Sequence, residues 1–307
     1  MNPLRGILLK ILSVTVFVAM ASLIKAASET VPPGQAVFFR SAFALPVIFA
    51  WLAMRGDLRD GWKTRQPLAH LWRGLIGTGA MGLGFTGLGL LPLPEVTAIG
   101  YAAPLLVVIF AAMFLNEQVR AFRLSCVGLG LVGVLIVLSP RLSVGVSASQ
   151  AETLGAVVVL MGAVLAALAQ VFVRKMVDTE RTAAIVLWFS VTSSVMGLLT
   201  IPWGWAMPTA GVAAMLVLAG LAGGIGQILL TSSYRHADAS LIAPFEYTSM
   251  LLALVIGYVV FSEVPTPAML AGAAIVILAG VLIIWRERQL GLERARQRKA
   301  QGHMGGK

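Results

Sequence analysis

Two ionisable residues, Arg40 and Glu246, stand inside long apolar runs, where a charge is costly. Insertion scales put that cost at about 2.5 to 3.5 kcal/mol at the centre of a membrane helix, so such residues are expected to serve a function. The guanidinium of Arg40 can donate hydrogen bonds to a ligand carbonyl or stack on a ring. Glu246 has no basic residue within one turn and is expected to be protonated, to bind ligand NH groups or to carry a coupling proton. Snorkelling of Arg40 and a hydrogen bond from Glu246 to a neighbouring helix are the structural alternatives.

Aromatic residues deep within the apolar runs predict walls for a ligand that contains a ring. The aromatic residues are Tyr101, Trp188, Phe245 and Tyr247. The amide of Gln227 is expected to add a polar contact. Small-ligand sites usually combine apolar walls with a few polar groups, which is the combination these residues offer. Packing in the protein core is the alternative for the four aromatic residues.

Glycines and prolines within the same runs predict close packing or flexing. Gly79, Gly82 and Gly84 belong to a glycine-rich run that would form a thin helix, which either packs closely on its neighbours or gives a flat ligand room. Pro104 and Pro244 each free a backbone carbonyl and weaken a helix locally. They mark either tolerated kinks or flexing points beside a binding site.

The composition indicates that membrane helices position these residues. The chain has 307 residues, of which 58% are hydrophobic and 12% charged. Soluble domains carry about 25% charged residues, so the polar surface here is too small to cover a soluble globule. We therefore predict an integral membrane protein of the all-α class.

Ten apolar runs are long enough, at about 20 residues, to cross the hydrocarbon core. They are residues 7–27, 34–54, 72–91, 95–115, 122–139, 153–173, 183–203, 209–232, 239–261 and 267–285. The first run is followed directly by the second and has no small-residue cleavage site, so we interpret it as a retained span. Lys25, near the outer end of this span, is expected to snorkel to the interface.

The basic residues predict the orientation of these spans. If the N-terminus is cytoplasmic, 20 of the 23 Lys and Arg residues lie in inside segments or at the cytoplasmic ends of the adjoining runs, as Lys10 does. Only Arg141 falls in an outside segment, and the remaining two, Lys25 and Arg40, fall within spans. Such asymmetry follows the positive-inside rule and predicts that both termini are cytoplasmic. It also explains the pI of about 10.5 without a nucleic-acid partner. The basic tail, residues 286–307, is either solvated or lies on anionic lipid.

Two segments of the chain share one pattern. Residues 94–117 and 237–263 each begin near an acid, pass through small residues and a proline, and end in an apolar stretch closed by a glutamate, Glu117 or Glu263. We interpret the chain as a duplicated unit of five spans. Because five is odd, the second copy enters the membrane in the opposite sense, which gives inverted repeats and favours alternating access. The expected segments are a first repeat at 7–139, a periplasmic linker at 140–152, a second repeat at 153–285 and the tail.

The segments LLVVIFAAMFLNE and APFEYTSMLLALVIGYVVFSE, within ten spans, resemble the EamA family of the drug/metabolite transporter superfamily. More narrowly, VPPGQAVFFRS (31–41) and GLGLLPLPEVTAIGYAAP (87–104) are similar to bacterial riboflavin importers of that family. The resemblance implies a secondary transporter of the bacterial inner membrane, with riboflavin uptake expected first. Export of amino acids or other metabolites is the alternative.

Other classes of protein find little support in the sequence. The chain has no GxxxxGK[ST] loop to bind ATP, and its GxGxxG matches, such as residues 77–82, lie inside apolar runs rather than in a βαβ unit. His70, His236 and His303 are far apart, and Cys126 stands alone, so we expect no metal and no cofactor. An intramembrane enzyme and a channel are the less favoured alternatives. The sequence predicts no oligomeric state.

Overall fold

The computed structural model describes residues 3–114, 121–142, 149–176, 179–236 and 243–304. All regular elements in these residues are helices. They are α1 (Pro3–Ala27), α2 (Pro33–Ala42), α3 (Ala44–Met54), α4 (Pro67–Leu90), α5 (Leu93–Gly100), α6 (Ala102–Phe114), α7 (Ala121–Leu142), α8 (Gln150–Met176), α9 (Thr182–Leu198), η1 (Ile201–Trp203), α10 (Ala210–His236), η2 (Ala243–Tyr247), α12 (Thr248–Phe261) and α13 (Pro267–Met304). Glu117 and residues 143–148 of the expected linker lie outside the described residues.

Six segments of the described chain are long and apolar enough to cross a membrane. They are Leu4–Ala27, Pro33–Met54, Leu93–Phe114, Gln150–Val173, Ala210–Leu230 and Pro267–Arg286. Three shorter apolar helices are Leu124–Pro140, Thr182–Leu198 and Phe245–Phe261. The glycine-rich α4 is in neither group, because glycine adds little hydropathy to a helix. The chain is an all-helical, multi-pass membrane protein, and the count of ten spans stays a prediction.

Three of the apolar runs are broken helices rather than continuous ones. The second run divides at Phe43, the fourth at Tyr101, and the ninth passes from η2 into α12 at Tyr247. Pro104 lies three residues beyond the break at Tyr101, in the first turn of α6, where a proline is tolerated because no intrahelical N–H is lost. Tyr101, rather than Pro104, therefore stands at the break in the fourth run.

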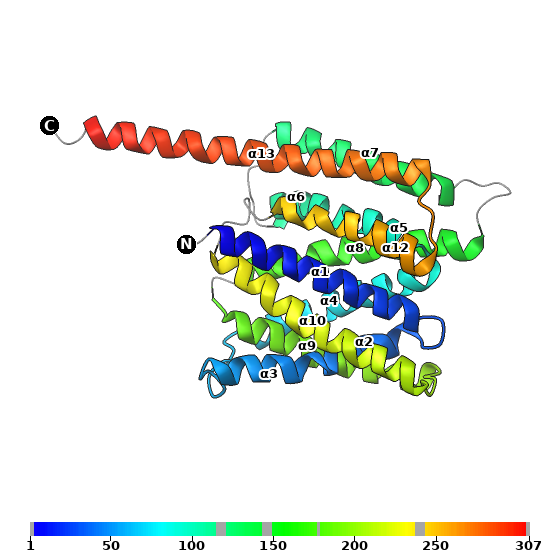
Figure 1. The fold of residues 1–307 in the computed structure, drawn as a ribbon. Helices are drawn as coiled ribbons and strands as arrows, with labels where there is room; N and C mark the ends of the chain where they lie inside the picture. The colour runs from blue at the N-terminus through cyan, green and yellow to red at the C-terminus, as the bar shows by residue number, and fades with distance from the viewer. Residues whose placement is uncertain (1–2, 115–120, 143–148, 177–178, 237–242, 305–307) are drawn as a thin grey trace.

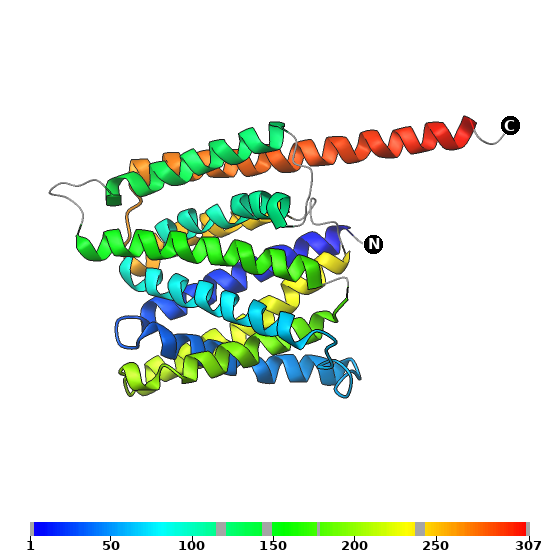
Figure 2. The same cartoon turned by 180° about the vertical axis from the view of Figure 1, so that it is seen from behind.

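The helices lie side by side and run roughly parallel, with their ends on two opposite sides of the bundle (Figure 1). The start of α1 and the long extension of α13 are at the same end. Helix α1 packs along α10, and α4 packs along α8, as seen from behind in Figure 2. Helix α2 packs on α9, and α7 packs on α13. Each of these four contacts joins a helix before residue 143 to one after residue 149.

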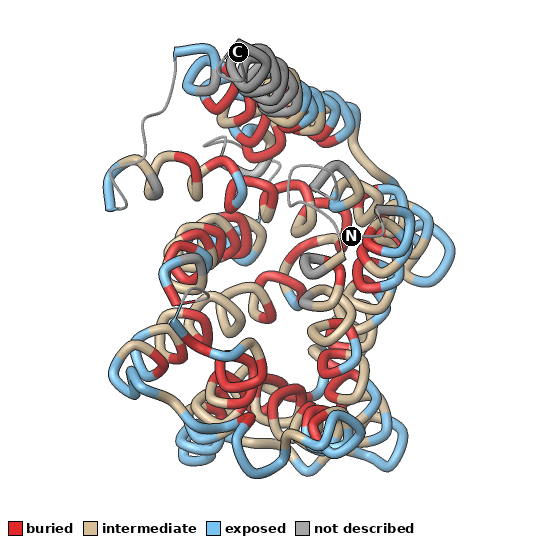
Figure 3. Tube along the Cα trace, turned by 90° about the vertical axis from the view of Figure 1, so that its left-hand side faces the viewer, coloured by how far each residue is buried: buried red, intermediate tan, exposed pale blue. Residues whose placement is uncertain are grey.

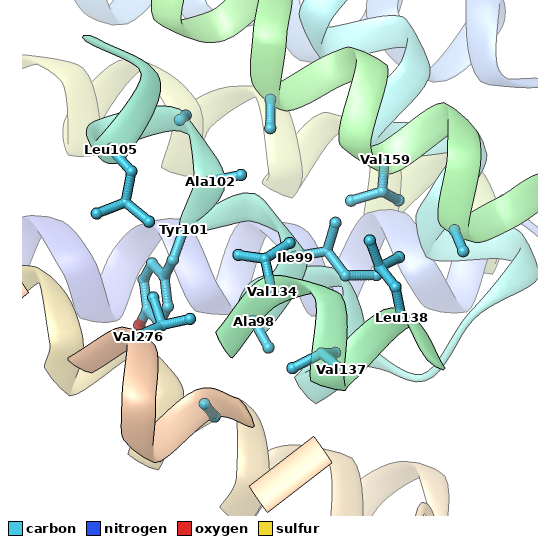
Figure 4. Packing of buried hydrophobic residues seen from close by; sticks show 14 of the residues in the cluster. Ala98, Ile99, Tyr101, Ala102, Leu105, Val134, Val137, Leu138, Val159 and Val276 are labelled. Atoms are coloured by element: carbon cyan, nitrogen blue, oxygen red, sulfur yellow. The ribbon is translucent and has the colours of Figure 1, made fainter. Parts of the chain in front are cut away.

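Buried residues lie where neighbouring helices face each other (Figure 3). The largest hydrophobic cluster joins α5, α6, α7, α8, α12 and α13. Tyr101 and Val276 of α13 both belong to this cluster, and both are labelled in Figure 4. Gly133 of α7 and Gly272 of α13 bring their backbones together, since a Cβ on Gly133 would lie 2.8 Å from the Gly272 carbonyl oxygen. In lipid, the burial of apolar side chains provides little driving force for helix association. Small residues instead let helix backbones approach closely and pack.

Candidate functional site

Glu246 lies in η2, at the break of the ninth run, and forms an ion pair with Lys10 of α1. The Lys10 side chain is only 3% exposed, whereas that of Glu246 is 49% exposed. The expectation of a buried, unpaired carboxyl at position 246 was therefore wrong. Sequence spacing did not reveal the partner, because it lies 236 positions away. Lys10 is a residue of this site that the sequence analysis assigned only to the cytoplasmic end of the first span.

The two tyrosines at the helix breaks contact each other. The ring centroids of Tyr101 and Tyr247 are 5.1 Å apart, with the planes at 73° in an edge-to-face arrangement. The Tyr101 hydroxyl lies 2.5 Å from Oγ of Ser249. The Tyr247 hydroxyl fills the space beside Gly280 of α13, where a Cβ would have no room. Two of the four predicted aromatic residues are thus brought together beside Glu246.

A small cavity opens next to this group, between α1, α5, η2 and α12. Its lining residues are Val14, Phe17, Val18, Ala21, Leu93, Thr97, Glu246 and Ser249. The cavity volume is about 110 Å³. Pockets for drug-sized ligands usually measure about 300 to 1,000 Å³, so in this conformation the cavity would hold only part of a larger molecule.

Arg40, on α2, is buried against α9 and α10. Its side chain is 5% exposed, and its guanidinium carbon lies 5.7 Å from the centre of the Phe189 ring. The guanidinium carbon of Arg73, on α4, lies 3.7 Å from the centre of the same ring. Nε of Arg40 and both Nε and Nη1 of Arg73 are buried without a hydrogen-bond partner among the described residues. Two cations therefore gather on one aromatic side chain between four helices.

Glycines create the room for this arrangement. A Cβ on Gly77 would lie 2.9 Å from the Phe189 ring, and one on Gly223 would lie 2.9 Å from Nε of Arg40. Of the three glycines singled out from the sequence, Gly79 meets Leu165 of α8, whereas Gly82 and Gly84 face open space. The glycine-rich helix thus packs closely along part of its length and leaves clearance along another.

The other predicted site residues are more scattered. Trp188 donates a hydrogen bond from Nε1 to the Trp62 carbonyl at 3.0 Å, which ties it to the loop after α3. It is therefore apart from the tyrosine pair, and its neighbour Phe189 is the aromatic residue that meets Arg40. Gln227 lies on α10 one turn beyond Gly223, and no described residue hydrogen-bonds to its side chain. Phe245 and Pro244 lie in η2 next to Glu246.

Two further charged residues, Lys25 and Glu180, bind groups at opposite ends of the bundle. Lys25 pairs with Glu263 at 2.8 Å and donates to the carbonyls of Leu88 and Leu91. Lys25 was expected to snorkel, yet it is bound within the protein. At the other end, a carboxylate oxygen of Glu180 accepts hydrogen bonds from the backbone N–H of Arg65 and Gln66.

Glu180 is buried at this end and lies 3.3 Å from Nε2 of His70. Burial raises the pKa of this carboxyl. The backbone hydrogen bond from Arg65 and the proximity of the His70 ring outweigh burial and hold the pKa below its ordinary value. Glu180 therefore binds the backbone just before α4 as a carboxylate. No group of metal-ligating side chains occurs among the described residues.

The EamA-like transporter family matches this sequence twice, over residues 4–139 and again over residues 153–286. The chain belongs to the EamA-like transporter family. Membership makes it a membrane transporter, and a small molecule is its substrate. Among its relatives, this EamA-like transporter is 27% identical to an S-adenosylmethionine uptake transporter of Rickettsia bellii, over 83% of this chain and 84% of the relative.

Two further relatives have other cargoes. The pseudopaline exporter CntI of Pseudomonas aeruginosa is 28% identical, over 91% of this chain and 95% of the relative. A riboflavin transporter of Rhizobium johnstonii is 27% identical, over 83% of this chain and 82% of the relative. These relatives differ in both cargo and direction at nearly equal identity. The residues of the site therefore have to decide the cargo of this EamA-like transporter.

Proposed function

We propose that the chain is a secondary transporter that moves a small metabolite across the bacterial inner membrane by alternating access. In this proposal the moving parts are two inverted repeats of five spans, residues 7–139 and 153–285, joined by the linker 140–152. Exchange of the conformations of two inverted halves converts an outward-open site into an inward-open one. The observation that carries the proposal is that matching residues of the two halves touch each other.

Tyr101 and Tyr247 are one such matching pair. Each lies the same number of residues before the glutamate that closes its segment, Glu117 or Glu263. Their rings are in contact at 5.1 Å. Two equivalent residues can meet only near the axis that relates the halves, so this contact supports a two-fold relation.

A second set of matching contacts surrounds Arg40. FFRS and LWFS place Arg40 and Phe189 in register, and GLIG and GLAG do the same for Gly77 and Gly223. Gly77 approaches Phe189, and Gly223 approaches Arg40. One turn away, Gly74 approaches Thr192 and Gly220 approaches Phe43, again a matching pair of contacts. This correspondence supports the same two-fold relation between α4 on α9 and α10 on α2.

Riboflavin uptake is the first candidate function. It is supported by the resemblance of two segments to riboflavin importers and by the relative from Rhizobium johnstonii. Riboflavin is flat and uncharged, with hydrogen-bonding groups at one edge. Tyr101 and Tyr247 could offer aromatic faces, Glu246 a polar contact, and the clearance at Gly82 and Gly84 room for the ring system.

Transport of a metabolite that carries a carboxylate is the second candidate, in either direction. The pair of arginines on Phe189 favours it, because no carboxylate among the described residues lies within ion-pair distance of Arg40 or Arg73. A neutral vitamin would leave both charges without a counter-ion.

Uptake into proteoliposomes tests the proposed function. Purified full-length protein would be reconstituted and given labelled riboflavin, S-adenosylmethionine or tryptophan, with and without a pH gradient. Movement of at least one of these compounds above protein-free vesicles is expected. If riboflavin alone moves, and the chain also lets a riboflavin auxotroph grow at micromolar vitamin, the first candidate is supported. No movement of any compound would contradict the function as proposed.

The orientation has its own test. With both termini cytoplasmic, a cysteine at Ser147, which lies outside the described residues, should react with an impermeant thiol reagent in intact cells after replacement of Cys126. A cysteine at Gln301 should stay unlabelled. The reverse pattern would overturn the inside and outside assignments.

A further inference from the structure

We infer that Arg40 of α2 and Arg73 of α4, which both lie over Phe189 of α9, form a binding site for a carboxylate group of the transported molecule. The inference rests on the proposed function of a metabolite transporter and selects between its two candidate cargoes. It assigns a role to Arg73, which lies at the start of the 72–91 run and which the sequence analysis does not single out.

The first argument is the lack of internal partners. Arg40 is 5% exposed, and its Nε has no hydrogen-bond partner among the described residues. The Nε and Nη1 atoms of Arg73 are also buried and without a hydrogen-bond partner among the described residues. An unpaired buried donor loses its hydration without replacement, and the loss is larger for a charged group. A fold that brings two such cations together is destabilised by them unless a ligand supplies the acceptors.

The second argument is that aromatic contact does not replace an anion. Both guanidiniums lie over Phe189, at 5.7 and 3.7 Å from the ring centre. A cation–π contact contributes about 0.5 to 2 kcal/mol, and it satisfies none of the N–H donors in the guanidinium plane. The two like charges also repel each other across a region of low dielectric constant. The Phe189 ring orients the two groups but leaves their donors open.

The third argument concerns the chemistry of the ligand. Guanidinium groups present a planar fork of donors that matches the two oxygens of a carboxylate. The side chains nearby add further polar atoms, since Oγ of Ser41 next to Arg40 is buried without a partner. Oγ1 of Thr78 and Oγ of Ser193 hydrogen-bond each other at 2.7 Å on the facing helices α4 and α9. A flat, monoanionic group fits a site whose walls are an aromatic ring and glycine-lined helices.

The position also suits a transport site. Arg40 and Phe189 are the matching residues of the two halves, so the site lies where α2 and α9 of opposite repeats meet. Only one half supplies the charge, because the residues that match Arg40 and Arg73 are Phe189 and Ala219. A ligand bound there would touch both halves and would be released as they move apart.

The experiment measures binding of benzoate, with benzamide as the uncharged probe of the same shape. Purified full-length protein in detergent is heated with each compound at constant ionic strength. Benzoate should raise the unfolding temperature of the unmodified protein by about 2 to 4 °C, as expected for a ligand near tenfold above its Kd, and benzamide should not. Arg40→Gln and Arg73→Gln should each abolish the shift, and Arg40→Lys should keep part of it.

Arg55→Gln is the matched control. Arg55 also stacks on an aromatic side chain, 4.5 Å from the Trp51 ring centre, but it is exposed at the end of α3. This variant should respond to benzoate like the unmodified protein. Equal shifts with benzamide, no shift with benzoate, or an undiminished shift in both Arg→Gln variants would overturn the inference. If an Arg→Gln variant fails to fold, the charge-retaining Arg40→Lys and the benzamide comparison still decide.

Transport by the same preparations separates this inference from the proposed function. Tryptophan and tryptophanamide would be compared with riboflavin in proteoliposomes. Movement of riboflavin that is unchanged in both Arg→Gln variants would sustain a transporter and overturn the carboxylate site. A benzoate shift that depends on both arginines, with no compound moving, would sustain the site while removing support for the proposed transport.

Discussion

Lys25 and Arg40 are both cations inside apolar runs, but the structure treats them in opposite ways. An ammonium group has three N–H donors, and those of Lys25 face three acceptors: Glu263 at 2.8 Å, the Leu91 carbonyl at 2.8 Å and the Leu88 carbonyl at 3.2 Å. Arg40 has an aromatic ring and a glycine beside it, with a buried Nε that has no partner among the described residues.

The difference separates a cation whose N–H donors are satisfied within the protein from one that has a buried donor left to bind a ligand. Lys25 ties the end of α1 to the end of α12 and to the turn between α4 and α5, and Glu263 completes this by accepting from the Leu93 N–H at 2.9 Å. Its contacts are complete without any other molecule. Those of Arg40 are not, which is why burial alone is a poor guide to function and the count of satisfied donors is a better one.

The largest expected effect is the loss of the Lys25 contact. Lys25→Ala leaves the partly buried Glu263 carboxylate, whose side chain is 13% exposed, without its cation, which is expected to destabilise the protein by up to about 3 kcal/mol. We expect membrane abundance and the unfolding temperature in detergent to fall together, with uptake per folded molecule less affected. The Lys25→Met, Glu263→Gln double variant should recover part of the stability. Full abundance with abolished uptake in Lys25→Ala would instead place this pair among the transport residues.

Glu246→Gln and Arg40→Ala should affect transport more than folding. Each is expected to cut uptake at least tenfold at normal abundance, about 1.4 kcal/mol of cargo interaction. Since Glu246→Gln leaves Lys10 buried without its counter-ion, the Lys10→Met, Glu246→Gln double variant is the control for stability. A parallel fall in abundance and uptake, restored by that double variant, would make the Lys10–Glu246 pair structural like Lys25–Glu263.

Gly77→Ala and Gly128→Ala test whether the ring beneath the arginines must be held in place. A Cβ at position 77 would lie 2.9 Å from Phe189, whereas one at position 128, on α7, meets nothing within 4 Å. We expect Gly77→Ala to reduce uptake severalfold by displacing Phe189 and the guanidiniums on it, and Gly128→Ala to be neutral. Equal uptake in the two variants would argue that the ring does not position the arginines.

The smallest expected effect concerns Glu180, a paired charge outside the apolar runs. Its pKa is lowered in the folded protein, so its stabilising contribution is complete above the ordinary carboxyl pKa of about 4.3 and is lost as the pH falls through the lowered value. Glu180→Gln should therefore lower the unfolding temperature slightly at neutral pH and reduce its decline in acid. An unchanged decline would show that other carboxyls dominate acid unfolding.

The sequence predicted the helical membrane class and the transporter family, because apolar length and segment pattern are local properties that a chain displays along its length. It also singled out Arg40, Tyr101, Glu246 and Tyr247. It did not reveal that Lys10 pairs with Glu246, or that Arg73 lies on the same ring as Arg40. Both facts depend on which helices are neighbours across the bundle, and nothing within a single run encodes that.

The Tyr101–Tyr247 contact has a consequence for the proposed alternating-access cycle. An edge-to-face pair is unequal by geometry, since one ring offers its rim and the other its flat surface, at 73° here. The two matching tyrosines therefore cannot both offer the rim, or both offer the face, in one conformation. In the proposed alternating-access cycle, the exchange of conformations between the two halves would therefore also exchange which tyrosine offers its rim and which its face.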